Sequence, residues 1–434
     1  MYTQGVRIRI DNDQLVVADP RGVLADEQLG ILREKTNEIK DGLAASKLLS
    51  AGPPVRVPRS ASDPVPLTFQ QQWLWDVMQE SNAENLSMPF SLRLSGELDV
   101  ESLRRSLSEL IRRHESLRTR IDVVDGVPMQ IVDQPYDHTL VITDMEAHVS
   151  ELERERQARH IVEELFRERF ELVSGPLFKV RLLRLSEYRY VLAIAIHHII
   201  TDGMSVVSMF RELWRLYAEA IRQQQFSSEA HQQYADYAIW QRRTHYHWLE
   251  QHEEYWTKKL SGTDRVRMPV TGNELEKPFT LAEMSFSLSL ELTLALRDLA
   301  RQERAQLSMI VLTLYIVVLS RWCDQRNFVL PFNVAGRHRP EHVHVLGYFA
   351  HILFLRIDFT GSETFAELLK IVTHEFAEAC RHIDSGRVSI ERPELVFSTF
   401  LQWLPWTADE LAGVPTLREW EKYVPNLSVG PFPV

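Results

Sequence analysis

One run of residues constrains the fold of this chain more than any other. The segment YVLAIAIHH, residues 190–198, has no polar side before its two histidines. A strand with a solvated face alternates polar and apolar side chains, so this strand is expected to lie centrally in a sheet and to be covered on both faces. Asp202 and Gly203 then mark a turn, and SVVSMFRELWRLYAEAI continues with apolar side chains at helical spacing. The pattern predicts a strand, a loop that carries the histidines, and a helix with Ser205 as its N-cap.

The chain alternates helical and strand patterns from residue 67 onward. PLFKVRLLRL, residues 176–185, alternates as a half-buried strand does, and ESLRRSLSELIRRHESL, residues 101–117, has leucines at helical spacing. MIVLTLYIVVL, residues 309–319, is too short to span a bilayer and indicates a buried helix. These patterns predict an α/β fold, with a second set of helices and strands after about residue 278 that forms another lobe.

The first fifty residues form a separate unit in this interpretation. GVRIRIDNDQLVV, residues 5–17, is typical of a β-hairpin with a polar turn, and residues 26–43 are typical of a short amphipathic helix with Asp26 as N-cap. The Pro- and Ser-rich segment from residue 50 indicates a linker. We therefore expect a small module at 1–49, a linker at 50–65, and two lobes at 66–265 and 266–434.

Composition excludes several function classes. The 434 residues are 44% hydrophobic, carry a formal net charge of −11, and lack the basic stripe of a nucleic-acid-binding protein. Two cysteines, Cys323 and Cys380, cannot form a disulfide framework, and the first residues lack the apolar core of a signal peptide. We expect a protein of the reducing cytoplasm with no nucleic-acid or membrane partner.

The histidine pair allows several interpretations. Side chains alternate across a strand, so His197 and His198 point to opposite faces, and a single histidine on an apolar strand is most often a core residue. A pair followed by Asp202 at a fixed spacing favours chemistry, because a base at a strand end needs an orienting carboxylate or a structural ion pair nearby. His, His and Asp could also bind a metal, but adjacent strand residues diverge, and HVHV at residues 342–345 lacks a third ligand. A serine hydrolase would need a G-x-S-x-G elbow, which the sequence does not contain.

Five motifs in order resemble those of the condensation domains of nonribosomal peptide synthetases. HHIITDG resembles the HHxxxDG signature of that family. PLTFQQQWLW, RRHESLRTRI and YADYAIWQ are similar to three further motifs, and VAGRHRPE with LGYFAHILFLR is similar to a Gly-Arg turn and the strand after it. The matches extend from residue 66 to residue 356.

The resemblance implies a fold and a set of roles. The fold would be α/β with α+β mixed sheets, in two lobes related to chloramphenicol acetyltransferase and set as a V-shaped pseudo-dimer with the histidine motif at their junction. His198 would be the catalytic residue and His197 a structural one. Asp202 would form a buried ion pair with Arg337 and fix the loop, and Gly203 would allow the tight turn.

The same resemblance implies the substrates. Two carrier proteins would present phosphopantetheine arms from opposite ends of a channel, and the chain itself would bind no cofactor and no metal. An upstream carrier would donate an acyl or peptidyl thioester to an amine or hydroxyl acceptor, on a second carrier or free in solution, to form an amide or ester. Met204, Ser205 and His351 are expected to line the donor and acceptor channel.

The N-terminal hairpin and helix resemble the β-hairpin docking domains that begin some synthetase subunits. An edge strand offers unpaired backbone groups to an extended peptide, and Arg7 and Arg9 would complement the acidic tail of an upstream carrier protein.

Several positions depart from the family pattern. Trp73 stands where the family usually has Arg, and His351 stands where Asn is common. A later motif is reduced to HIDSGRVS from His382 and a final Arg-Asp motif is missing, so we expect an incomplete second lobe. These departures keep open a non-catalytic module that only recruits carrier proteins, as well as a free-standing acyltransferase. An epimerisation domain is disfavoured because its later signature is absent, and a heterocyclisation domain because it has Asp in place of the first histidine.

Overall fold

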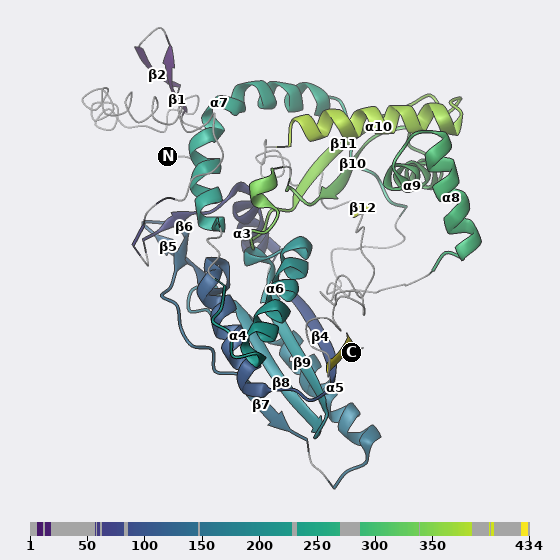
Figure 1. Cartoon of the computed structure of the whole chain (residues 1–434). Helices are drawn as coiled ribbons and strands as arrows, with labels where there is room; N and C mark the ends of the chain where they lie inside the picture. The colour runs from purple at the N-terminus through teal and green to yellow at the C-terminus, as the bar shows by residue number, and fades with distance from the viewer. Residues whose placement is uncertain are drawn as a thin grey trace.

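The structure is a computed structural model of the chain (Figure 1). It describes residues 57–269, 287–383, 399–402 and 427–432, with short gaps at 58, 61–62, 82–85, 146–147, 228–231, 338 and 400, and the backbone of residues 7–11 and 14–18. The expected helix at 26–43, its N-cap Asp26 and most of the linker lie outside the described residues.

The larger sheet has five strands in the order β13-β4-β9-β8-β7. They are β4 (Ser87–Gly96), β7 (Val141–Asp144), β8 (Phe178–Ser186), β9 (Arg189–His197) and β13 (Leu427–Pro431). The apolar strand β9 is central, as predicted, because it pairs antiparallel with β4 on one side and with β8 on the other.

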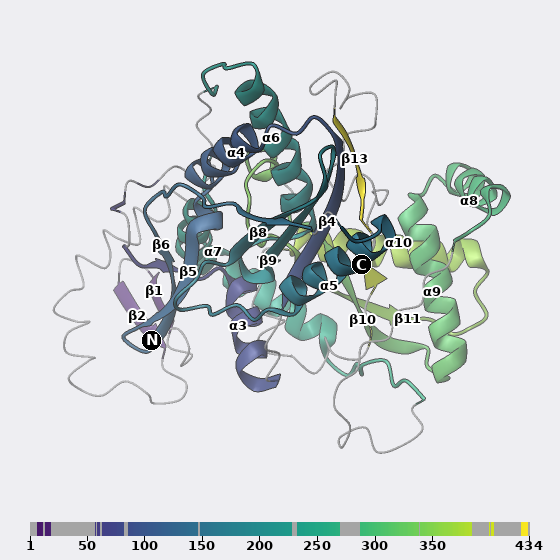
Figure 2. The same cartoon turned by 90° about the horizontal axis from the view of Figure 1, so that it is seen from below.

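Helices cover both faces of this sheet (Figure 2). Helices α4 (Val100–Arg113) and α6 (Gly203–Ile221) pack together on one face, and α5 (Glu151–Arg167) contacts β4, β8 and β9 on the other. All three helices share one apolar core with the sheet. The two-face coverage explains why residues 191–196 of β9 are all apolar.

The smaller sheet lies in the second lobe and has the order β11-β10-β12. Its strands are β10 (Asn327–Val334), β11 (His351–Asp358) and the short β12 (Leu401–Gln402), packed with α8 (Leu290–Gln302), α9 (Leu307–Cys323) and α10 (Phe365–Arg381) around a second core. A third sheet, β3-β6-β5, is formed by β3 (Val65–Pro66), β6 (Val127–Val132) and β5 (Thr119–Val124).

Two helices connect the cores. The long helix α7 (Tyr234–Leu260) contributes Tyr237 to the first core and Trp256 to the second (Figure 1). Helix α3 (Phe69–Ser81) carries Trp73, which packs against both cores. The last described strand, β13, returns to the larger sheet beside β4, which the expected division at residue 265 did not include. Helices α3 and α7 and strand β13 therefore all connect the two lobes.

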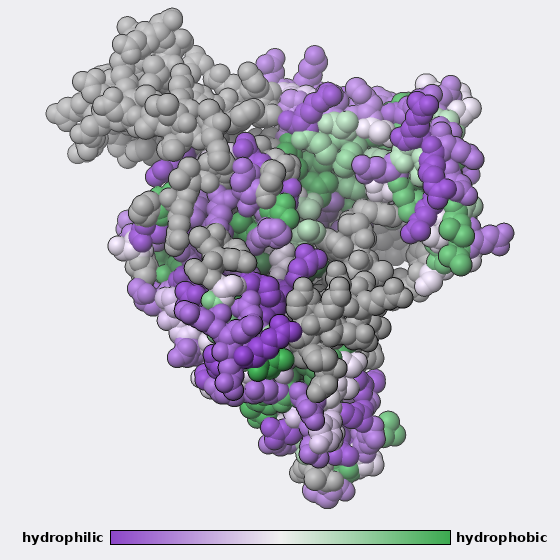
Figure 3. Space-filling view, in the orientation of Figure 1, coloured by the Kyte–Doolittle hydropathy of each residue, from purple (hydrophilic) through white to green (hydrophobic). Residues whose placement is uncertain are grey.

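Two expectations about helices need correction. The N-cap of α6 is Asp202, whose carboxylate accepts the backbone N–H of Ser205, so Ser205 lies in the first turn of the helix. Helix α9 was expected to be buried, yet Leu314, Val318 and Trp322 are exposed on one side of it. In the space-filling view, hydrophobic and hydrophilic residues are mixed over α8 and α9 (Figure 3). The mostly apolar composition of α9 therefore does not reflect burial on every side.

The N-terminal hairpin is confirmed at the level of backbone pairing. Strands β1 (Arg7–Asp11) and β2 (Gln14–Ala18) pair antiparallel, with Arg9 opposite Val16. Within the described residues no single helix has the length and apolar composition to cross a membrane. Helices α8 and α9 meet that test only as a pair, which bends by 104° at the break between them.

Candidate functional site

The histidine motif lies where the central strand leaves the sheet. Strand β9 ends at His197, and His198 begins a short 3₁₀ turn that runs to Ile200, before α6 starts at Gly203. The backbone N–H of His198 donates to the carbonyl of Leu86 at 2.8 Å, which holds the strand end against the neighbouring segment. The two histidines therefore occupy different backbone environments as well as different faces.

His197 is a core residue. Its side chain is fully buried, its Nδ1 accepts the backbone N–H of Ile199 at 3.1 Å, and its ring meets the edge of Phe170. Burial lowers the pKa of His197 to about 3, and the neighbouring His198 adds to the shift. The imidazole is neutral at physiological pH, which fits the structural role expected of it.

His198 is half-buried and has a defined tautomer. Its Nδ1 lies 2.8 Å from the carbonyl oxygen of Thr201, and a carbonyl can only accept a hydrogen bond, so Nδ1 carries the proton. The basic lone pair is then on Nε2. The ring packs edge-on against Tyr348, with centroids 4.9 Å apart. This arrangement is suited to a general base, because Nδ1 is anchored and Nε2 is the nitrogen that carries the lone pair of the neutral ring.

The predicted ion pair between Asp202 and Arg337 is present and almost fully buried. The guanidinium donates to Oδ2 of Asp202 at 2.7 Å, and the backbone N–H of Phe349 donates to the same oxygen at 2.9 Å. The guanidinium also lies over the Phe349 ring, 4.5 Å from its centroid. Asp202 thus links the start of α6 to the second lobe and does not contact His198 through any of these bonds.

Ser205 reinforces the same link. Its hydroxyl donates to the carbonyl of Gly347 at 2.7 Å, and it accepts from the backbone N–H of Gly347 at 2.9 Å and from Arg337 at 2.7 Å. A buried hydroxyl with these partners stabilises the lobe contact, whereas the sequence placed Ser205 on the channel. Gly203 and Met204 are half-buried in the first turn of α6.

The segment before β11 forms the opposite wall of the site. Tyr348 packs on His198, and its backbone carbonyl accepts from the hydroxyl of Tyr234 on α7. Burial raises the pKa of both tyrosines well above the usual value, so both hydroxyls stay protonated. A Cβ on Gly347 would come within 2.0 Å of the Tyr234 ring, so this close approach requires glycine. Sequence reasoning missed Tyr348, although the LGYF motif contains it.

His351 lies at the lobe contact. It is buried at the start of β11, beside the Gln70 side chain of α3, and its Nδ1 lies beside the carbonyl of Phe349. The expectation that it lines an open channel rests on resemblance alone.

The structure shows where the histidines considered as metal ligands lie. His342 is fully buried against Tyr237 and Phe349, whereas His344 is exposed, so the two do not share one environment. Among the described residues there is no group of three or more His, Cys, Asp or Glu side chains that could hold a metal ion.

Comparison with known proteins identifies the family. A family model described as "Condensation domain" matches residues 61–391. The chain belongs to the condensation-domain family. It is 36% identical over 341 residues to a linear gramicidin synthase of Brevibacillus parabrevis, and the match covers 75% of this chain and 6% of that protein. It is 34% identical over 354 residues to phosphinothricin tripeptide synthetase PhsC of Streptomyces viridochromogenes, covering 77% of this chain and 31% of that protein. The chain thus spans a small part of the curated relatives it matches.

Solved structures share the fold of this condensation domain. The X-domain from teicoplanin biosynthesis has a TM-score of 0.71 at 23% identity and covers 88% of this chain and 85% of that one. The first condensation domain of the CDA synthetase has a TM-score of 0.65 at 19% identity, with 80% and 84% covered. The predicted two-lobed fold, like that of chloramphenicol acetyltransferase, is confirmed.

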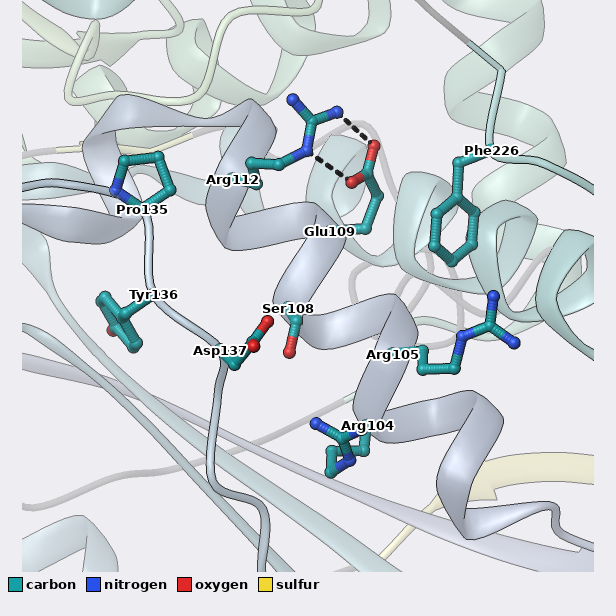
Figure 4. Close-up of a pocket in the computed structure, with 9 residues that line it drawn as sticks. All are labelled: Arg104, Arg105, Ser108, Glu109, Arg112, Pro135, Tyr136, Asp137 and Phe226. Atoms are coloured by element: carbon teal, nitrogen blue, oxygen red, sulfur yellow. Dashed lines mark hydrogen bonds and ion pairs between the residues drawn. The ribbon is translucent and has the colours of Figure 1, made fainter.

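The condensation domain also has a surface cavity of about 350 Å³ outside the histidine motif (Figure 4). Its three arginines all have partners: Arg104 pairs with Glu101, Arg112 forms two bonds to Glu109, and Arg105 lies over Phe226. We assign this cavity no part in acyl transfer. Its lining residues are Arg104, Arg105, Ser108, Glu109, Arg112, Pro135, Tyr136, Asp137 and Phe226.

Proposed function

We propose that this condensation domain transfers an acyl or peptidyl group from a carrier-bound thioester to an amine or hydroxyl acceptor, forming an amide or an ester. The observation that carries the proposal is the state of His198. Its Nδ1–H is anchored on the Thr201 carbonyl, which leaves Nε2 as a base at the junction of the two lobes. The relatives named as peptide synthases support the same reaction.

In this proposal His198 acts on the acceptor. Nε2 accepts the proton as the acceptor nitrogen or oxygen attacks the thioester carbon. The new C–N or C–O bond forms, the C–S bond breaks, and the donor thiolate leaves and takes up a proton. An amine of pKa about 8 needs mainly positioning, whereas a hydroxyl is scarcely ionised near neutrality and depends on the base.

The remaining residues hold this geometry. Asp202 and Arg337 fix the start of α6 against the second lobe, and His197 fixes the strand end from the core side. Gly203 and Met204 lie next to the loop, where the phosphopantetheine arm of a carrier protein would pass. The cofactor belongs to the partner, and the chain supplies the walls of the channel and the base His198.

The N-terminal hairpin is assigned to partner recognition. Strands β1 and β2 form a two-stranded sheet, and Arg7 and Arg9 lie two positions apart on β1. In this proposal the hairpin adds the acidic tail of an upstream carrier protein as a further strand.

A second candidate function is recruitment without catalysis. It is favoured by the likeness to an X-domain that has been solved in complex with OxyB, at a TM-score of 0.67. Under this alternative the chain would bind carrier proteins, and His198 would be dispensable.

One experiment separates the two. A donor-loaded carrier protein is incubated with the chain and a panel of amines and alcohols, and intact-mass spectrometry follows loss of the acyl group from the carrier. We expect transfer by the wild type and none above background by His198→Ala, and the panel reveals the acceptor class. Binding of the carrier without transfer by either protein would support recruitment and refute the catalytic proposal.

A further inference from the structure

A row of buried polar side chains connects the two lobes next to the histidine motif. Gln241 on α7, Gln70 on α3 and His351 on β11 are each at most 6% exposed. The backbone N–H of Phe69 donates to Oε1 of Gln241 at 2.9 Å, and Nε2 of Gln241 donates to Oε1 of Gln70 at 3.1 Å. Nε2 of Gln70 lies 2.5 Å from Nε2 of His351, and Nδ1 of His351 lies 2.5 Å from the carbonyl oxygen of Phe349.

The ends of this row fix the direction of every bond in it. The backbone N–H of Phe69 can only donate, so it must face the oxygen of Gln241, and the amide nitrogen of Gln241 must then face the oxygen of Gln70. The nitrogen of Gln70 is left to donate to His351. At the other end the carbonyl of Phe349 can only accept. The two fixed ends agree, so no amide in the row can turn over without placing two donors or two acceptors together.

This direction defines the state of His351. Its Nε2 must carry a lone pair to accept from Gln70, and its Nδ1 must carry the proton that Phe349 accepts. The imidazole is therefore neutral and in the Nδ1–H tautomer. A protonated ring would present a second N–H to the Gln70 amide, and the resulting clash of donors could not be relieved along the row.

The row ends on the wall of the candidate active site. Phe349 is held on both sides, because its N–H donates to Asp202 and its carbonyl accepts from His351. The adjacent Tyr348 packs on His198. Gly336 completes the contact: it has φ +66°, and a Cβ there would lie 1.9 Å from the Phe349 oxygen and 2.5 Å from Nδ1 of His351. The nearby charges, Asp202 and Arg337, are paired with each other.

We propose that His351 is a positioning residue that, as the neutral Nδ1–H tautomer, completes a one-directional hydrogen-bond chain between the lobes and holds the Tyr348–Phe349 segment against His198. An asparagine amide can take the place of Nδ1 but is too short to reach Gln70, so the tie between the lobes is a property of the histidine. The effect on turnover rests on the proposed acyl transfer, whereas the tautomer does not.

The tautomer is tested by ¹⁵N NMR of histidine-labelled full chain at pH 7.5. The signals of His351 are those that His351→Asn removes. We expect a protonated-type shift at Nδ1 and a lone-pair-type shift at Nε2 in the wild type. The variant Gln70→Glu replaces the donor with an acceptor for both neighbours, so His351 should become doubly protonated. Gln72→Glu adds the same charge on the same helix, where Gln72 contacts Asp76, and should leave the signals of His351 unchanged. An Nε2–H tautomer in the wild type, or no response to Gln70→Glu, would overturn the proposal.

Two substitutions separate the two bonds of His351 in an acyl-transfer assay. His351→Asn keeps a donor for the Phe349 carbonyl, so kcat should stay within about threefold of wild type. His351→Gln reaches toward Gln70 but loses the Phe349 bond, so kcat should fall by about tenfold or more with KM little changed, because small displacements of reacting groups slow a reaction strongly. Equal losses in the two variants would refute the positioning role. Absence of transfer by the wild type would refute the proposed function and leave the tautomer result standing.

Discussion

The two sides of the β9 strand end carry the same residue type and differ in everything else. On the core side His197 is fully buried, receives a backbone N–H and has a pKa lowered to about 3. On the junction side His198 is half-buried, donates to a carbonyl and packs on Tyr348 from the other lobe. The hydrogen-bond partner of Nδ1 decides the tautomer in each case. The comparison shows that environment, and not residue type, separates a structural histidine from a candidate base.

Both sides depend on the loop that follows, so the largest expected effect comes from its ion pair. Asp202→Ala leaves Arg337 buried without its carboxylate and also removes the N-cap of α6 and the acceptor for Phe349. We expect a loss of about 3–5 kcal/mol in the free energy of unfolding, measured by urea denaturation. Asp298→Ala removes an exposed ion pair with Arg301 and should cost less than about 1 kcal/mol. An Asp202→Ala protein of wild-type stability that lacks turnover would make Asp202 a chemical participant and contradict this account.

A smaller effect is expected from the hydroxyl that links the junction side to the second lobe. Ser205→Ala leaves the buried backbone groups of Gly347 without their partner, which should cost about 1–3 kcal/mol in the free energy of unfolding. Ser362→Ala, an exposed serine in the turn before α10, is a matched control with an expected change within about 0.5 kcal/mol. Equal midpoints of urea unfolding for both variants would show that Ser205 does not hold the lobes together.

The burial of His197 on the core side predicts how the free energy of unfolding changes at acidic pH. The folded state keeps His197 neutral down to about pH 3, whereas the unfolded chain takes up a proton near pH 6.5, so stability is present above pH 6.5 and falls as the pH drops below it. Between pH 7 and pH 5 this histidine should cost the wild type about 2 kcal/mol in the free energy of unfolding. Glutamine does not titrate in this range. Between pH 7 and pH 5 the free energy of unfolding of the His197→Gln variant should therefore fall by about 2 kcal/mol less than that of the wild type. Parallel pH profiles for the two proteins would place the pKa of His197 near its usual value.

The sequence predicted what depends on apolar spacing and on the five motifs. The central position of β9 and the α6 pattern agree with the structure, since both follow from the spacing of apolar residues. The ion pair between Asp202 and Arg337, which the family resemblance implied, is also present. The N-cap was misplaced by three residues, because Asp and Ser both suit that position and only the backbone shows which one caps.

Other features depend on contacts between distant segments. The Thr201 carbonyl that sets the tautomer of His198 is a backbone group, so no side chain marks it in the sequence. The row from Gln241 through Gln70 to His351 joins residues more than a hundred positions apart and becomes visible only when α3, α7 and β11 meet. Exposure of one side of α9 was missed because an apolar run gives no information about which side is covered.

The central claim is that His198 acts as the base in acyl transfer, whereas His197 stabilises the fold. One paired measurement tests this claim. His197→Gln and His198→Gln are compared for acyl-transfer rate per folded molecule and for urea unfolding at pH 7.5. We predict that His198→Gln lowers the rate at least about 100-fold with an unchanged unfolding midpoint. His197→Gln should shift the midpoint and keep the rate within a few-fold of wild type. A His197→Gln protein that folds fully and loses transfer as completely as His198→Gln would contradict the division.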